Sequence, residues 1–147
     1  AMTTIRALGP ADEADWRRLW RLYLAFYETE RPEAVYAETF RRLLDPGEPM
    51  RGLVAERAGG VIGICNVIRH RHCWSEADVT YLQDLYVDEA ARGTGAGRAL
   101  IEAVYALADA EGAPSVYWMT QEFNYAGRML YDRIGVKTPF IKYVRPA

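Results

Sequence analysis

The chain of 147 residues is half apolar and about a quarter charged, and its formal net charge is -2. This length and composition predict one globular domain over residues 2–147, and the near-neutral charge offers no basic surface for nucleic acid. No apolar run reaches the ~18 residues of a membrane helix and no signal peptide is recognisable. We therefore expect a cytoplasmic protein that does not enter a membrane.

The first half of the chain is predicted to form a strand, two helices and a hairpin. Residues 3–8 are rich in β-branched side chains and end at Gly9-Pro10, which predicts a short strand. Residues 33–44 predict the second helix. The first helix is predicted from large side chains at helical spacing, with Asp12 as its cap and Trp16, Leu19, Trp20, Tyr23 and Tyr27 as its apolar stripe. Gly59-Gly60 between the apolar runs 53–57 and 61–68 predicts a tight hairpin.

The second half is predicted to alternate strands and helices. Residues 69–78 form a polar loop, in which His70 and His72 lack a third ligand nearby, and this favours a solvated loop over a metal site or a general base. Cys65 and Cys73 lack CxxC spacing and are expected to be free thiols. Strands are predicted at 81–87, 115–120 and 140–144, and helices at 95–112 and 124–134. This order predicts a mixed α/β sheet with helices on its faces.

A glycine-rich turn between the strand at 81–87 and the next helix is the strongest local signal. It reads Arg92-Gly93-Thr94-Gly95-Ala96-Gly97-Arg98. Three glycines let a ligand approach the backbone, and the unpaired amides at a helix start favour an anion. With two flanking arginines, the turn predicts a pyrophosphate site. The alternative is a turn that only lets the helix pack closely on the sheet. The spacing fits neither a P-loop nor a dinucleotide fingerprint.

Several motifs together resemble one enzyme family. RxxGxG at Arg92, Gly95 and Gly97, after a strand that ends Asp84-Leu85-Tyr86-Val87, is similar to the acetyl-CoA signature of the GNAT acetyltransferases. Within that superfamily, the segment YLQDLYV at 81–87 resembles the diamine and polyamine acetyltransferase branch. Asn124 followed by Tyr131, and Phe26-Tyr27-Glu28 near the start, are similar to the same branch.

The resemblance implies a fold and a cofactor. The fold would be a central mixed, mostly antiparallel sheet of six to seven strands, splayed between strands four and five, with four helices on its faces. Acetyl-CoA would bind in the splay without a metal, with its pantetheine on Leu85, Tyr86 and Val87, its pyrophosphate on the amides from Arg92 to Arg98, and its thioester near Asn124 and Tyr131. Tyr27 and Glu28 would contact the acceptor. The family often forms dimers through C-terminal strands, so a homodimer is expected.

The resemblance also assigns catalytic roles. A tyrosine at the position of Tyr131 would protonate the leaving thiolate. An alkyl amine with a pKa of ~10.4 must lose a proton before it attacks, but Gln83 stands where the polyamine branch has a glutamate, and an amide cannot act as a base. Gln83 can position water, and Asp84 would point to the opposite face of a regular strand. Glu122 and Glu28 remain alternative bases.

Three functions compete at this point. The first is an N-acetyltransferase that transfers the acetyl group of acetyl-CoA to a primary amine by direct attack in a ternary complex. The acidic residues Glu28, Glu30, Glu33 and Glu38 would suit a diamine or polyamine acceptor, but a solvated face interleaved with arginines explains them equally well. The second is a non-catalytic acyl-CoA-binding sensor of the same fold. The third is an unrelated nucleotide-binding α/β protein.

Overall fold

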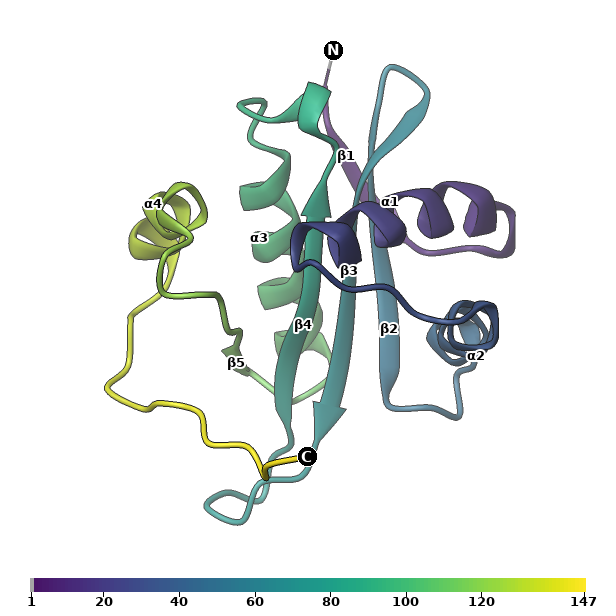
Figure 1. The fold of residues 1–147 in the computed structure, drawn as a ribbon. Helices are drawn as coiled ribbons and strands as arrows, with labels where there is room; N and C mark the ends of the chain where they lie inside the picture. The colour runs from purple at the N-terminus through teal and green to yellow at the C-terminus, as the bar shows by residue number, and fades with distance from the viewer. Residues whose placement is uncertain (1) are drawn as a thin grey trace.

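The computed structural model describes residues 2–147 and contains a mixed sheet with helices on both faces (Figure 1). Within these residues the sheet has five strands in sequence order, β1 (Thr4–Ala7), β2 (Met50–Arg57), β3 (Gly60–His70), β4 (Val79–Val87) and β5 (Ser115–Tyr117). Neighbouring strands from β1 to β4 are antiparallel, and β4 and β5 are parallel. The predicted fold class is confirmed.

Four α-helices lie on or beside the sheet, as predicted. They are α1 (Glu13–Phe26), α2 (Glu33–Leu44), α3 (Ala96–Ala110) and α4 (Tyr125–Ile134), with short 3-10 turns at Pro10–Asp12 and Glu89–Ala91. α1 and α2 cover one face, α3 covers the other, and α4 lies beyond β5 (Figure 1). Among residues 2–147, no helix is both long enough and apolar enough to span a membrane.

The apolar stripe of α1 faces the sheet, as its spacing predicts. Trp16 and Leu19 are fully buried, and the rings of Trp16 and Trp20 stack with centroids 5.1 Å apart. Burial of one such side chain contributes about 1.5–3 kcal/mol, so this stripe anchors the helix. The predicted cap is wrong. The Asp12 side chain caps no helix amide, because its carboxylate instead binds the Arg6 guanidinium through two bonds of 2.7 Å.

The hairpin between β2 and β3 turns one residue earlier than predicted. Its central residues are Ala58 and Gly59, which have φ angles of 52° and 79°, and Gly60 already pairs with Arg57. Both turn residues thus adopt the left-handed conformation that a two-residue hairpin requires. The alanine accepts this conformation because the ladder on both sides fixes the register.

A β-bulge interrupts the pairing of β3 with β4. Asn66 pairs with Asp84 and Val67 with Leu82, so Gln83 has no partner on β3. Side chains normally alternate between the faces of a sheet, and one extra residue reverses that alternation. Leu82 and Leu85 therefore both pack in the core beneath α3, whereas Asp84 points toward α1.

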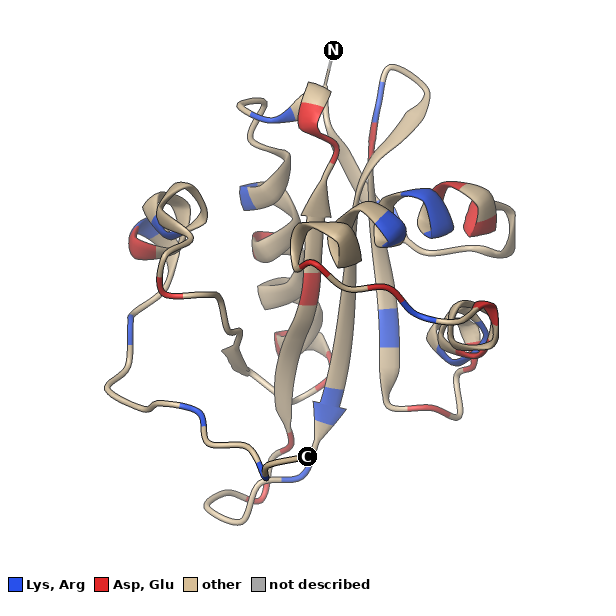
Figure 2. Ribbon diagram, viewed as in Figure 1, with Lys and Arg blue, Asp and Glu red and all other residues tan. Residues whose placement is uncertain are grey.

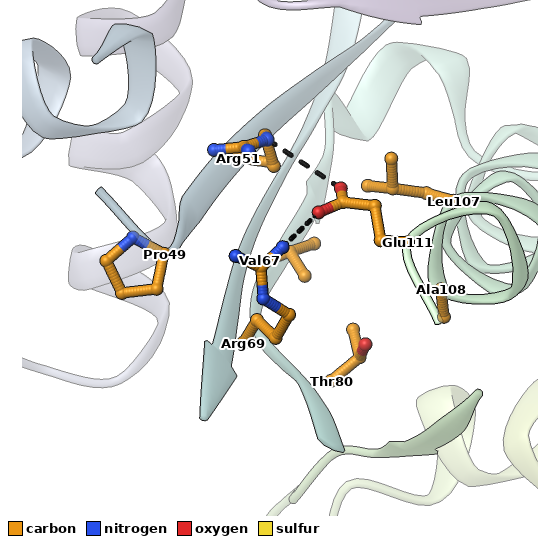
Figure 3. A pocket seen from close by; sticks show the side chains of 8 residues that line it. All are labelled: Pro49, Arg51, Val67, Arg69, Thr80, Leu107, Ala108 and Glu111. Carbon is orange, nitrogen blue, oxygen red and sulfur yellow. Dashed lines mark hydrogen bonds and ion pairs between the residues drawn. The ribbon is translucent and has the colours of Figure 1, made fainter. Parts of the chain in front are cut away.

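A small cleft near the C-terminal end of α3 is filled by its own ion pairs (Figure 3). Glu111 pairs with Arg69, and its other carboxylate oxygen lies 3.7 Å from the Arg51 guanidinium. The Thr80 hydroxyl donates to the carbonyl oxygen of Ala113 at 2.8 Å. These contacts tie the end of α3 to β2, β3 and β4, and the neutralised charges leave no anion site there.

The last part of the chain is loosely packed. α4 has no buried residue, and the segment after it runs without regular structure to the C-terminus (Figure 1). The strand predicted at 140–144 is wrong, so the described residues form five strands and not six to seven. Apolar side chains of this segment, Phe140, Ile141, Tyr143 and Val144, are 72–88% exposed. The expected homodimer stays a prediction, and it concerns this exposed segment.

Candidate active site

The parallel strands β4 and β5 separate after three residue pairs. Tyr81 and Tyr117 form the last pair, β5 ends there, and β4 continues to Val87. The cleft beyond this point is lined by Tyr23, Tyr27, Leu82, Gln83, Leu85, Ile101, Trp118, Met119 and Tyr131. Leu85, Tyr86 and Val87, which are predicted to hold pantetheine, pair with β3 on the edge of β4 that faces away from the cleft. The edge of Leu85–Val87 that faces the cleft has no neighbouring strand, so its backbone groups are available to a ligand, except the Val87 carbonyl, which accepts from Arg92.

The glycine-rich turn lies at the open end of this cleft. Gly93 and Gly95 have φ angles of 82° and 85°, which only glycine adopts readily. α3 begins at Ala96, one residue later than predicted. Gly95 is its N-cap residue, and the Gly95 carbonyl accepts a backbone hydrogen bond from the Ala99 amide. The amides that precede Ala99 in this first turn lack an i-4 partner, as at any helix start. They provide the positive end of the helix dipole for an anion.

The space around Gly97 distinguishes the two interpretations of the turn, which are a pyrophosphate site and a turn that only lets the helix pack closely on the sheet. A Cβ added there would lie 3.5 Å from a Leu130 side-chain carbon and 3.9 Å from one of Val87, which are ordinary contacts. Close packing of α3 therefore does not require a glycine at this position. The bare Cα instead widens the space between the end of β4 and α4, where a ligand chain would pass.

The two arginines of the turn occupy different positions. Arg92 donates to the Val87 carbonyl at 3.2 Å, and its guanidinium lies over the Tyr86 ring at 5.3 Å. It therefore stands beside the free edge of β4. Arg98 pairs with Glu102 at 2.7 Å on the surface of α3. Its charge is partly neutralised before any ligand arrives, so Arg92 is the better candidate for a phosphate contact.

Tyr131 reaches the cleft from α4. Its ring packs edge-on against Trp118, with centroids 5.7 Å apart. Burial raises the pKa of its phenol above the ordinary value of 10, and Tyr27 and Cys65 raise it further. The phenol is therefore protonated at neutral pH and can donate a proton. Asn124 does not line the cleft. It caps α4, since its Oδ1 accepts from the Gly127 amide at 3.3 Å, and it thereby orients the helix that carries Tyr131.

Asp84 and Gln83 point in different directions, as predicted for neighbours, although the strand is bulged. Asp84 is buried, and its Oδ2 accepts from Trp20 Nε1 at 3.1 Å and from Asn66 Nδ2 at 2.9 Å. The two hydrogen bonds hold this carboxylate in place against α1 and β3. The Gln83 side chain is exposed, and its backbone carbonyl accepts from the Tyr23 hydroxyl at 3.4 Å.

Of the two expected acceptor contacts, Tyr27 lines the cleft and Glu28 does not. Burial raises the pKa of the Tyr27 phenol, and the charge of Asp84 raises it further. Glu28 follows the end of α1 with a φ of 56°, and its side chain is exposed. Tyr23 also lines the cleft; its spacing predicts the core-facing stripe of α1, with part of that stripe open to the acceptor site as the alternative. Trp118 and Met119 were placed inside a longer strand, and only the early end of β5 turns them into the cleft wall.

The cleft walls carry no free carboxylate, and within residues 2–147 no group of three or more histidine, cysteine or acidic residues could hold a metal ion. A splayed parallel pair beside a glycine-rich helix start defines an enzyme that transfers acyl groups from coenzyme A. The chain matches the acetyltransferase (GNAT) family over residues 16–136. It belongs to this family and is an acetyl-CoA-dependent N-acetyltransferase.

Two relatives and two solved structures extend this result. Over 143 residues the chain is 39% identical to the D-amino-acid N-acetyltransferase HPA3 of Saccharomyces cerevisiae, covering 96% of this chain and 89% of the relative. Over 141 residues it is 29% identical to the uncharacterized N-acetyltransferase YhfO of Bacillus subtilis, covering 95% and 94%. These names do not point to the diamine and polyamine branch.

The fold is similar to that of the aminoglycoside N-acetyltransferase AAC(6')-Iy. Its complex with a bisubstrate analogue has a TM-score of 0.87 at 19% identity and covers 100% of this chain and 99% of that chain. Its complex with CoA has a TM-score of 0.86 at 19% identity, covering 99% and 95%.

Proposed function

We propose that this enzyme acetylates the amino group of a small amino acid by direct attack on acetyl-CoA in a ternary complex. The observation that carries the proposal is the chemistry of the cleft wall, which is uncharged and rich in phenols. Phenol hydroxyls can donate hydrogen bonds to a carboxylate, and an apolar wall accepts a small side chain. The name of the relative that is 39% identical supports the same class of acceptor.

The surface charges argue against a polycationic acceptor. A diamine or polyamine would need unpaired carboxylates near the cleft, and the acidic residues of α2 are instead neutralised by arginines. Glu33 pairs with Arg17, and Glu38 pairs with both Arg41 and Arg42. Figure 2 shows acidic and basic residues interleaved over α1 and α2, which is the pattern of a solvated face.

The proposed cofactor position uses the cleft and the turn together. The free edge of β4 at Leu85–Val87 would receive the pantetheine amides as a further strand would. The amides from Gly93 to Arg98 would receive the pyrophosphate, with Arg92 beside them. This path brings the thioester to the part of the cleft that Gln83 and Tyr131 line.

The proposed chemistry needs three groups. The neutral amine attacks the thioester carbonyl, and a backbone amide at the free edge of β4 stabilises the oxyanion. Tyr131, which stays protonated, donates its proton to the departing thiolate. Gln83 positions water, and Asp84 holds Trp20 and Asn66 in place beneath the bulge without touching the substrate.

The test is thiol release from acetyl-CoA over a panel of D- and L-amino acids, polyamines and aminoglycosides. We expect turnover on amino acids, and a Tyr131→Phe variant should lower kcat by about 10–100-fold, because it removes the proton donor and keeps the ring against Trp118. Tyr125→Phe, which changes an exposed phenol on the same helix, is the matched control. Turnover on polyamines alone would contradict the acceptor class, and binding of acetyl-CoA without any turnover would favour the sensor function.

A further inference from the structure

A histidine and a tyrosine meet where the cleft closes. His70 is the last residue of β3 and Tyr117 is the last residue of β5, so both end their strands on either side of β4. His70 Nε2 lies 2.8 Å from the Tyr117 hydroxyl, and His70 Nδ1 lies 2.8 Å from the Arg71 carbonyl oxygen. A carbonyl can only accept, so Nδ1 carries a proton. The lone pair of the neutral ring is therefore on Nε2 and accepts from Tyr117.

Tyr117 connects this pair to the cleft through Tyr81. The two tyrosine rings stack with centroids 4.6 Å apart and an angle of 6°, and they form the last residue pair before the strands separate. Burial raises the pKa of Tyr81, and its neighbours Tyr117, Asp84 and Tyr27, the last of which lines the cleft, raise it further. The phenols of Tyr27, Tyr81 and Tyr117 thus form a row from the cleft to the His70 imidazole.

Among these groups, His70 is the one with a nitrogen lone pair that faces a hydroxyl. The pKa values of Tyr81 and Tyr117 are raised, in both cases mainly by burial, so neither phenol is deprotonated near neutral pH. Asp84 is held by Trp20 and Asn66, and Gln83 is an amide. The His70 imidazole has a ring nitrogen that can accept a proton from a hydroxyl and later release it to water.

We propose that His70 accepts, through the Tyr117 hydroxyl, the proton that the acceptor ammonium must lose before it attacks the thioester. The proposal rests on the acetylation of an amine proposed above. The ammonium N–H bond breaks as its proton passes to the Tyr117 oxygen, and the Tyr117 O–H bond breaks as that proton passes to His70 Nε2. The imidazolium then releases one proton to solvent. His70 acts on the substrate through Tyr117 and is a positioning residue in that sense.

The surroundings of His70 are compatible with this role. Its own loop contributes Arg71, whose guanidinium pairs with Asp78 at 3.2 Å. β5 contributes Tyr117, and β4 contributes Tyr81 behind it. The nearby positive charge of Arg71 is therefore paired with Asp78 and does not face the imidazole alone.

The pH profile of kcat/KM separates a proton relay from a structural hydrogen bond. His70→Gln keeps an acceptor for Tyr117 but cannot bind a proton, so we expect kcat/KM to fall by about 10–100-fold at pH 7. The loss should shrink to within about twofold near pH 9.5, because the amine is then increasingly neutral without help. Tyr117→Phe, which keeps the ring stacked on Tyr81, should give the same profile. His72→Gln, an exposed histidine of the same loop, is the control and should leave the profile unchanged.

A second acceptor makes the test independent of folding effects. With aminoacetonitrile, whose amine is already neutral at pH 7, His70→Gln and Tyr117→Phe should match the wild type. An equal loss at every pH and with both acceptors, or no loss at all, would overturn the relay. If the wild type acetylates an amine other than an amino acid, only the acceptor class is refuted, and the profiles are measured with that amine. If it acetylates none, the relay falls together with the proposed function.

Discussion

The part of the molecule that ends with α3 and the part that follows it differ in packing. β1–β4 lie between two cores in which Trp16, Ile64 and Leu100 are fully buried. α4 has no buried residue, and the segment after it is exposed. The glycine-rich turn and the free edge of β4 belong to the packed part, whereas Trp118 and Tyr131 belong to the loose part. Substitutions of buried core side chains in the first part should therefore mainly lower stability, and those of cleft residues in the second part should mainly lower activity.

Trp16→Ala should produce the largest loss of stability. It removes a fully buried ring from the core and leaves Asn66 Oδ1 without the indole donor that now lies 3.0 Å away. We expect the free energy of unfolding to fall by about 3–5 kcal/mol. Trp118→Ala, in the loose part, should lower it by less than about 2 kcal/mol, because that ring is only half-buried. Urea denaturation followed by circular dichroism measures both, and equal losses would contradict the comparison.

Two glycine substitutions in the turn should differ in what they change. Gly95→Val should lower both stability and acetyl-CoA binding, whereas Gly97→Ala should affect binding alone. Gly95→Val forces a branched side chain to a φ of 85°, so it should cost about 1–3 kcal/mol of stability and weaken acetyl-CoA binding. Gly97→Ala meets only ordinary contacts and should leave stability within about 0.5 kcal/mol.

The Cβ of Gly97→Ala points toward the space between β4 and α4, so the KM for acetyl-CoA should nevertheless rise. Isothermal titration with acetyl-CoA, alongside thermal unfolding, distinguishes the two effects. Unchanged affinity in Gly97→Ala would show that the ligand does not pass this position.

Asp12→Asn should have a small effect on stability, which is present at neutral pH and disappears at acid pH. Hydrogen bonds from Arg6 lower the pKa of the Asp12 carboxyl below its ordinary value of 3.8, so the ionised form stabilises the fold above that pH. This contribution is lost as the pH falls through the lowered pKa. Arg6 is 40% exposed, which screens the pair, so we expect about 1 kcal/mol. Unfolding measured from pH 6 to pH 2 should show a flatter acid decline in the variant.

Features that depend on local sequence could be predicted. The bounds of α2, the stripe of α1 and the position of the glycine-rich turn follow from spacing and backbone preference over a few residues. The family resemblance added the splay and Tyr131. The strand expected at 140–144 has aromatic and β-branched residues, which favour a strand, but a strand also needs a neighbour to pair with, and the described chain provides none there.

The meeting of His70 with Tyr117 could not be predicted for a related reason. The two residues are 47 positions apart, and their contact depends on the register of three strands and on where β5 ends. No local pattern in the sequence carries that information. The bulge at Gln83 was equally hidden, because a regular strand and a bulged strand share the same residue preferences.

The shape of β4 depends on the number of residues in the strand more than on which side chain stands at position 83. Because Gln83 is the unpaired extra residue, its deletion would leave Leu82, Asp84 and Leu85 on their present faces. The deletion would, however, remove the local bend that a bulge imposes on a strand. The bend of β4 beside the cleft therefore depends on the presence of an extra residue at this position, whereas the Gln83 side chain determines only the contact with water.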